Sequence, residues 1–261
     1  MDKKQDTIYA LSTPPGKSAI AVVRISGNKA FNYIKKISSS MPTKANISTL
    51  NKLITRTGDV IDQTITTYYK APKSYTGEDM VEISMHGGSA TINKFIDIFK
   101  KNKKTRLAEP GEFTRRSFEN NKLDLTQVEA IADLVNAETE YQRKQAYSQL
   151  EGKLTLKTKE IYNELKNTLA NIEAIIDFTD EELPKKLLNN TKEQIENISD
   201  NIESILNNNN KGRKIREGFV VGIIGNTNTG KSSFINNVSN QEIAIVSNKP
   251  GTTRDAIESY I

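Results

Sequence analysis

The run at residues 225–232, Gly-Asn-Thr-Asn-Thr-Gly-Lys-Ser, most strongly limits what this chain can fold into. Its spacing is that of a phosphate-binding loop, in which two glycines let backbone N–H groups and a helix N-terminus point at phosphate oxygens. The apolar run 219–224 predicts the buried strand that precedes such a loop, and residues 233–238 predict the helix that follows. Lys231 would then reach the β- and γ-phosphates, and Ser232 would bind Mg²⁺. A chance glycine-rich turn rarely supplies all of these features, so the sequence predicts nucleotide binding.

The composition narrows the class of protein further. At 261 residues, the chain is long enough for about two domains. Its 37 Lys+Arg and 32 Asp+Glu give a net charge of +5. This charge is compatible with an RNA partner but does not require one, because solvated helix surfaces explain it equally well. The chain has no cysteine, which excludes disulfides and thiolate metal sites. We find neither a secretory signal nor an apolar run of the ~20 residues that span a membrane. We therefore expect a cytoplasmic protein, or one inside an organelle.

Residues 1–120 mix strand and helix patterns. Val81, Ile83 and Met85 alternate with polar residues, which is the period of a half-buried strand. Ile92, Phe95, Ile96 and Phe99 share one face of a predicted helix. The sequence therefore predicts an α+β domain, with strands at 20–25, 61–69 and 81–85, a turn at 13–16, and helices at 30–37 and 90–99.

From Leu125 the pattern becomes helical. Apolar residues recur at steps of three and four up to Ile176, which predicts one very long helix or two in sequence, with Gly152 as a weak point. A further helix begins near Pro184, and its isoleucines at 195, 198, 202 and 205 are typical of a bundle or coiled-coil seam. Residues 207–214 are interpreted as a flexible linker into a nucleotide domain.

Several motifs, in order along nearly the whole chain, carry a resemblance to a known family. Those of the first half are Val23–Gly27, Tyr75–Asp79, His86–Gly88, Pro110–Thr114 and Lys122–Leu125, and those of the second half are Glu129–Leu134, the phosphate loop, Ala244–Ser247 and Gly251–Asp255. Together they resemble the MnmE (TrmE) family of tRNA modification GTPases. An Era-like GTPase would share the loop but has no such N-terminal domain.

This resemblance implies a domain organisation and a set of partners. Residues 1–120 would form a domain that binds a tetrahydrofolate derivative, in its 5-formyl or methylene form, and that pairs into a homodimer. Residues 121–215 would form the first part of an all-α domain, and residues 216–261 the opening strand, loop and helix of a GTPase domain. With the FAD-dependent protein MnmG (GidA), the family installs a carboxymethylaminomethyl-type group at C5 of the wobble uridine of tRNA.

The resemblance also implies site residues for the folate. It places folate contacts on Arg24, Glu82 and Lys122. This is chemically sensible, because a carboxylate can hold the amide-like edge of a pterin and a cation can hold the carboxylates of the folate tail. Without the resemblance, Glu82 is the outward residue of an alternating strand and Lys122 a surface cation. The single histidine, His86, has no partner visible in the sequence, and its role is left open.

For the nucleotide, the resemblance implies GTP, Mg²⁺ and K⁺. It places Mg²⁺ on Ser232 and Thr253, and it places K⁺ on Asn228, Ser247, Lys249 and Thr252, where the cation would neutralise developing charge. Thr227 and Pro250 depart from the residues usual in the family. The full set of expected GTP contacts is Asn228, Thr229, Gly230, Lys231, Ser232, Ser233, Ser247, Asn248, Lys249, Pro250, Gly251, Thr252 and Thr253.

The later GTPase motifs are not in the sequence. Neither Asp-x-x-Gly nor Asn-Lys-x-Asp follows the first switch, and no catalytic residue is identified. We therefore expect a fragment of a GTPase that does not turn over GTP by itself. The alternative is a folate-binding dimerisation module with no turnover of its own.

Overall fold

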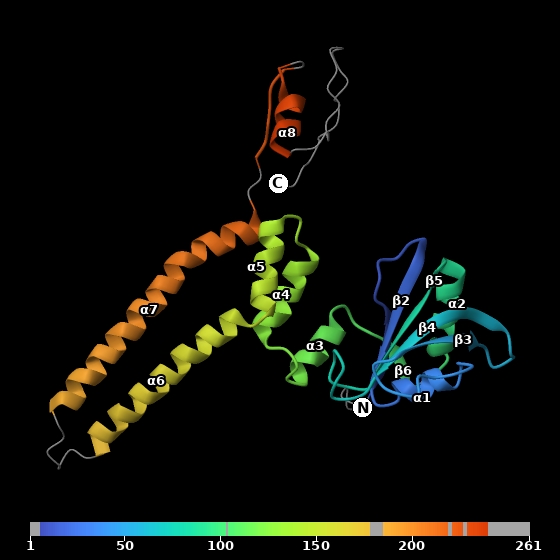
Figure 1. Ribbon diagram of the computed structural model, residues 1–261, viewed down its shortest axis with the longest axis horizontal. Helices are drawn as coiled ribbons and strands as arrows, with labels where there is room; N and C mark the ends of the chain where they lie inside the picture. The colour runs from blue at the N-terminus through green and yellow to red at the C-terminus, as the bar shows by residue number, and fades with distance from the viewer. Residues whose placement is uncertain (1–5, 103, 178–184, 219–220, 227–228, 240–261) are drawn as a thin grey trace. The chain divides into compact units, whose positions relative to one another are not determined.

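The chain forms two compact units, Met1–Leu125 and Thr126–Ile261, each of which is considered by itself (Figure 1). This is a computed structural model, and it describes residues 6–102, 104–177, 185–218, 221–226 and 229–239.

The first unit is a six-stranded sheet with two of its helices packed on one face. The strand order is β3-β4-β5-β2-β1-β6, and all neighbours are antiparallel except β1 and β6. This confirms the α+β fold predicted for the first part of the chain. The elements are β1 Thr7–Leu11, β2 Ser18–Ser26, α1 Ala30–Lys35, β3 Ser48–Ile54, β4 Val60–Tyr69, β5 Met80–Gly87, α2 Ser89–Lys100, β6 Thr105–Leu107 and α3 Glu112–Glu119.

The core of this unit lies between the sheet and the two helices α1 and α2. Alternate residues of β2 and β5, such as Val23 and Ile83, are fully buried and pack against Ile34 of α1 and Phe95 of α2. Burial of such large apolar side chains contributes about 1.5–3 kcal/mol each. The predicted alternation of β5 and the predicted apolar face of α2 are thus confirmed.

The opposite face of the sheet carries the alternate set of side chains. In register across this face stand Thr67 of β4, Glu82 of β5, Arg24 of β2 and Ala10 of β1. Because side chains alternate along a strand, the buried apolar neighbours of Arg24 and Glu82 oblige these two residues to point away from the helices. The fold therefore brings together two charged residues that are far apart in sequence.

The second unit begins with four helices: α4 Leu125–Val135, α5 Glu140–Leu150, α6 Lys153–Asp177 and α7 Lys185–Glu217. The helical prediction is confirmed, but the single or double helix expected up to Ile176 is wrong, because the segment contains three helices. Thr139 caps α5 through a capping box with Gln142, which starts a new helix there. Gly152 has a φ of +81°, which ends the α5 segment at the predicted weak point.

The linker expected at residues 207–214 is also wrong, because α7 continues through it to Glu217. Tertiary contacts override the weak local helix preference. Gln145 of α5 donates a hydrogen bond to the Gly212 carbonyl at 3.1 Å, and Arg216 forms an ion pair with Asp133 of α4 at 2.9 Å. These contacts attach the end of α7 to the preceding helices.

The strand expected at 219–224 is not found where the structure describes it. Residues 221–224 have no assigned secondary structure, and Val221 and Ile224 are 78% and 95% exposed. A strand exists only when a neighbour accepts its backbone hydrogen bonds, and no described strand lies beside this segment. The helix expected after the loop is present as α8, Lys231–Ser239. Among the described helices, none combines the length and apolar character needed to cross a membrane.

The β2–α1 connection allows a direct stability test at Gly27. Its φ is +136°, and a Cβ added there would lie 2.8 Å from the Cα of Thr7. We expect Gly27→Ala to lower the free energy of unfolding by about 2 kcal/mol, measured by urea titration. Gly16→Ala is the matched control, because Gly16 has a similar φ of +146° and nothing within 4 Å of the added Cβ. An equal loss in both variants would show that backbone strain, and not the clash with Thr7, sets the cost.

Candidate functional site

Arg24 and Glu82 form a direct ion pair on the open face of the sheet. The Nε and Nη2 atoms of Arg24 lie 2.8 and 2.6 Å from Oε1 of Glu82. The two side chains are 25% and 23% exposed, so the pair is accessible without being fully solvated. A carboxylate accepts about four hydrogen bonds, and this geometry leaves Glu82 with capacity for donors from a ligand.

Two aromatic rings flank the guanidinium of Arg24. Its Cζ atom lies 4.9 Å from the ring centre of Tyr75 and 5.5 Å from that of Phe113, at cation–π distances. Tyr69 lies nearby, and burial together with the Glu82 carboxylate raises the pKa of its phenol. We call Arg24, Glu82, Tyr75 and Phe113 the sheet-face cluster. It combines one charge of each sign with two flat apolar surfaces.

Lys122 lies close to the loop that supplies Tyr75. Its ammonium donates a hydrogen bond to the Pro72 carbonyl at 3.0 Å, and its side chain lies against Gly77. Gly77 has a φ of +78°, which favours glycine. The contacts of Lys122 are therefore with the 72–77 segment, and its ammonium is not bonded to Arg24 or Glu82.

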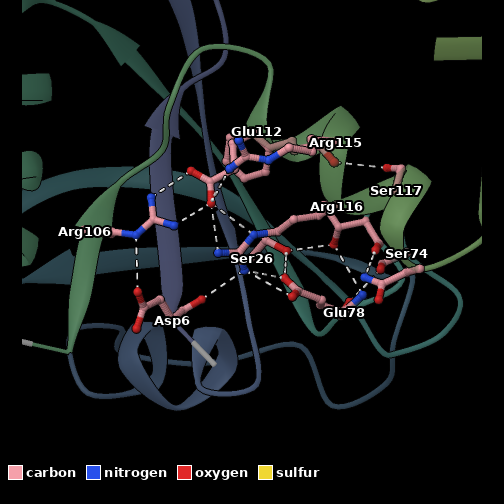
Figure 2. A network of polar contacts seen from close by, with 12 residues as sticks. Asp6, Ser26, Ser74, Glu78, Arg106, Glu112, Arg115, Arg116 and Ser117 are labelled. Carbon is pink, nitrogen blue, oxygen red and sulfur yellow. Dashed lines mark hydrogen bonds and ion pairs between the residues drawn. The ribbon is translucent and has the colours of Figure 1, made fainter. Parts of the chain in front are cut away.

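A buried polar network holds α3 and the 74–79 loop in place (Figure 2). Glu112 is its centre: its carboxylate accepts bonds from Arg106 at 2.6 and 2.8 Å and from Arg116 at 3.0 and 3.3 Å. Arg116 also donates to Glu78 at 2.9 Å, and Glu78 accepts a bond from Ser26 at 2.7 Å. The network therefore joins α3, the 74–79 loop and the end of β2.

The same network positions the aromatic rings of the sheet-face cluster. Phe113 follows Glu112 directly on α3, and Tyr75 lies in the loop that Arg116 holds through Glu78. Tyr75 is further fixed by a 2.8 Å hydrogen bond between its hydroxyl and that of Thr114, and by Ser117, which donates to its carbonyl at 2.6 Å. The two rings beside Arg24 thus depend on α3 for their position.

Glu112 is ionised at neutral pH despite its burial. Burial opposes ionisation, but hydrogen bonds from Arg106, from the Glu109 backbone N–H and from Arg116 lower its pKa to about 2. The same pairing raises the pKa of Arg106. Glu112 and Arg106 therefore both stay charged over the physiological range.

The phosphate loop lies in the second unit, before α8. The Lys231 ammonium bonds the carbonyls of Gly225, at 2.9 Å, and Asn226, so the described part of the loop folds around its own lysine. Thr229 Oγ1 donates to the Asn226 carbonyl at 2.9 Å, and Gly230 has a φ of +86°. Gly230 also accepts the backbone bond from Phe234 that opens the helix. Ser232 and Ser233 lie in the first turn of α8.

Other predicted nucleotide residues lie outside the described residues. These are Asn228 and the set Ser247, Asn248, Lys249, Pro250, Gly251, Thr252 and Thr253. The expected K⁺ site and the Thr253 part of the Mg²⁺ site therefore have no structural account here. No group of three or more metal-ligating side chains is found among the described residues.

His86 has a partner that the sequence did not suggest. Its Nδ1 lies 2.7 Å from Oδ1 of Asp62, and its backbone N–H donates to Oδ2 of the same carboxylate at 2.8 Å. Burial raises the pKa of Asp62, but the bonds from His86 and from the Gln63 N–H outweigh it and lower the pKa overall. The pair links β5 to β4, which is a structural role.

Sequence reasoning noted the motifs that contain Tyr75, Glu112 and Phe113 but gave these residues no role, and it did not single out Arg116. A signal was present, because Glu112, Arg115 and Arg116 have the i, i+3 and i+4 spacing at which opposite charges meet on a helix. The contacts to Arg106 and Glu78 had no such signal, since they depend on the sheet.

Together, the fold and the sites define a class of protein: a sheet domain with a polar, aromatic-flanked cluster, followed by a helical unit that carries a phosphate-loop sequence. Two family models match the chain, "GTP-binding protein TrmE N-terminus" over residues 7–122 and "MnmE helical domain" over residues 125–261. The chain belongs to the MnmE (TrmE) family of tRNA modification GTPases.

Individual relatives agree with this assignment. The chain is 45% identical over 256 residues to the "tRNA modification GTPase MnmE" of Pelagibacter ubique, and 43% identical over 261 residues to that of Rickettsia prowazekii. It is 42% identical over 253 residues to the protein of the same name from Dinoroseobacter shibae. These matches cover 97–98% of this chain but only 58–59% of each relative. The chain thus spans a little over half the length of these relatives.

Proposed function

We propose that this chain functions in GTP- and folate-dependent tRNA modification, together with an FAD-dependent partner of the MnmG type. The product would be a carboxymethylaminomethyl-type group at C5 of the tRNA wobble uridine. The observation that carries the proposal is that one chain of this family combines the sheet-face cluster with a loop folded around Lys231. The sheet-face cluster can hold a one-carbon donor, and the loop around Lys231 can hold a nucleoside triphosphate.

The residues of the sheet-face cluster fit a tetrahydrofolate derivative. The Glu82 carboxylate is a suitable acceptor for the amino and N–H donors of a pterin edge, and it is held in place by Arg24 at 2.6 Å. The rings of Tyr75 and Phe113 offer flat surfaces for a heterocycle. Lys122, on which the resemblance places a folate contact, lies against Gly77 of the same loop, and such a cation can hold the carboxylates of the folate tail. When bound, the folate would supply the one-carbon unit, and these side chains would orient it.

For the nucleotide, Lys231 and the first turn of α8 support phosphate binding. The backbone N–H groups at the start of a helix and the lysine ammonium both stabilise negative charge. Ser232, in that first turn, is the residue we propose for Mg²⁺, with Thr253 and the Asn228 K⁺ site as further proposals. The base would be guanine by relation to the family.

A homodimer is the proposed state of the first unit. On the open sheet face, Leu50 of β3 pairs with Ile65 of β4, and these side chains are 62% and 48% exposed. Apolar side chains that gather on an exposed sheet face mark interaction surfaces. A second copy covering them would bring the two sheet-face clusters near the interface.

The alternative function is a folate-binding dimerisation module without GTP turnover. It is favoured by the fact that Arg24, Glu82 and Lys122 all lie in the first unit, which has its own core. The two functions share the folate site and differ in whether Lys231 is needed.

Disrupting the gene that encodes this chain tests the proposed function. We expect the modified wobble uridine to disappear from total tRNA, measured by nucleoside mass spectrometry. The intact gene should restore the nucleoside, and a Lys231→Ala version should not, because the phosphate loop then lacks its cation. Full restoration by Lys231→Ala would favour the folate module, and unchanged tRNA in the disrupted strain would contradict both functions.

A further inference from the structure

A basic groove lies on the helix side of the first unit, away from the sheet-face cluster. Its volume is about 1140 Å³, and it runs between α1, the β3–β4 turn and α2. Seven of its lining residues are Lys or Arg, and one, Asp97, is acidic. The groove alone thus has a formal charge of +6, which exceeds the net charge of +5 of the whole chain.

The cations of the groove come from three separate segments of the first unit. Lys29, Lys35 and Lys36 lie on or next to α1, and all three are exposed. Arg56 is presented by the β3–β4 turn, where the Thr55 N–H donates to the Asp59 carbonyl at 2.8 Å. A helix and a hydrogen-bonded turn thus supply four of the seven cations.

The other three cations come from α2 and the segment that follows it. Lys94, Ile98 and Lys101 are separated by four and three positions, so they lie on the same side of α2 and its C-cap. Lys104 follows shortly before β6. None of the seven cations forms an ion pair with a described carboxylate. Asp97 itself lies 3.8 Å from Lys100, outside the groove lining, so even the single acid is partly compensated. The positive potential of the groove is therefore not neutralised within the described chain.

We propose that this groove binds the phosphodiester backbone of RNA, and tRNA in particular. Cations contributed by α1, the β3–β4 turn and α2 to one groove suit a polyanionic chain, because several successive phosphates can then be neutralised together. The lining also includes the side-chain amides of Asn32 and Asn102, whose NH₂ groups can donate to phosphate and ribose oxygens. The choice of tRNA as the occupant rests on the proposed function.

The lining also distinguishes RNA from an anionic membrane. Ile37 is buried, and Ile98 and Tyr33 are partly buried, so the groove has no exposed large apolar side chain among its described lining residues. A surface that enters a bilayer interface needs such side chains on a convex face. The groove instead offers a concave, charged surface with Tyr33 within it. RNA contacts here would leave the opposite sheet face free for folate.

The test is binding of the whole chain to a fluorescently labelled tRNA transcript, followed by anisotropy at several salt concentrations. Two double variants remove groove charges, Lys94→Gln with Lys101→Gln and Lys35→Gln with Lys36→Gln. Each should weaken binding and reduce the slope of log affinity against log salt by about 2, because each phosphate contact contributes about 1. Lys17→Gln with Lys44→Gln is the matched control, since both lysines are exposed and lie outside the groove.

Three outcomes would overturn the proposal. One is an equal loss of affinity in the control and groove variants, which would show a dependence on net charge alone. Another is no saturable binding of tRNA by the unmodified chain. The third is binding to phosphatidylserine vesicles that is as tight as binding to tRNA and equally sensitive to the groove variants. Failure of the groove proposal can be told apart from failure of the proposed function. The modified nucleoside would still disappear on gene disruption if tRNA bound at another surface of the chain.

Discussion

Replacing Glu112 by glutamine is expected to lower the melting temperature of the first unit by roughly 10 °C at neutral pH. Removing one partner of a buried ion pair costs about 3–5 kcal/mol, because the opposite charges remain buried. Glutamine keeps the shape of glutamate but turns an N–H₂ group toward guanidinium donors. Arg106 and Arg116 now donate four bonds to Glu112, and Arg116, which is only 5% exposed, would lose acceptors that water cannot replace. Thermal unfolding followed by circular dichroism measures the shift.

Glu119→Gln is the matched control for this variant. Glu119 lies on the same helix, 3.9 Å from Arg115, but both side chains are nearly half exposed. Exposed ion pairs contribute about 0–1 kcal/mol, so a shift of only a few degrees is expected. Equal shifts in the two variants would contradict the central position of Glu112 in the network.

Acid gives an independent check on the same group. The pKa of Glu112 falls from 4.5 to about 2 in the folded chain, so its ionised form stabilises the fold above pH 4.5 and that contribution is lost as the pH falls toward 2. The difference in melting temperature between the unmodified chain and Glu112→Gln should therefore shrink over this interval. A constant difference would show that the carboxylate does not act through its charge.

The elements that sequence reasoning found are those whose apolar residues follow the periodicity of their own structure. β5 and α2 are examples, since one face of each is apolar and the other polar. β3 breaks this rule, because Asn51 faces the core while Leu50 is exposed, and its pattern therefore gave no strand signal. α3 was missed for a similar reason: its buried residues include Glu112, Arg116 and Ser117, which are satisfied by partners and not by apolar packing.

The candidate site residues likewise divide into those that a local motif reveals and those that only the tertiary fold brings together. Lys231 and its loop could be recognised locally, because the whole motif is contiguous. Arg24 and Glu82 came from the resemblance, and their contact spans 58 positions in sequence and depends on the register of β2 and β5. Tyr75 and Phe113 reach Arg24 only because the Glu112 network places α3. That dependence is tertiary and had no counterpart in local patterns.

Loss of the Glu82 carboxylate is expected to weaken binding of a tetrahydrofolate derivative by about 100-fold. Two hydrogen bonds from a pterin edge to a carboxylate contribute about 1.5–3 kcal/mol each, and glutamine can accept only one of them. Arg24→Ala should have a comparable effect, because it removes the group that orients Glu82 and contacts both rings. Glu119→Gln again serves as the control, as an exposed carboxylate in the same unit.

Calorimetric titration of the whole chain with 5-formyltetrahydrofolate tests the central claim most directly. We predict saturable heat with one site per chain, retained in Glu119→Gln and reduced about 100-fold in affinity in Glu82→Gln. Folding of each variant is checked by its melting temperature before the titration. Absence of heat with folded protein, or equal affinities for the unmodified chain and Glu82→Gln, would contradict the assignment of the sheet-face cluster as the folate site.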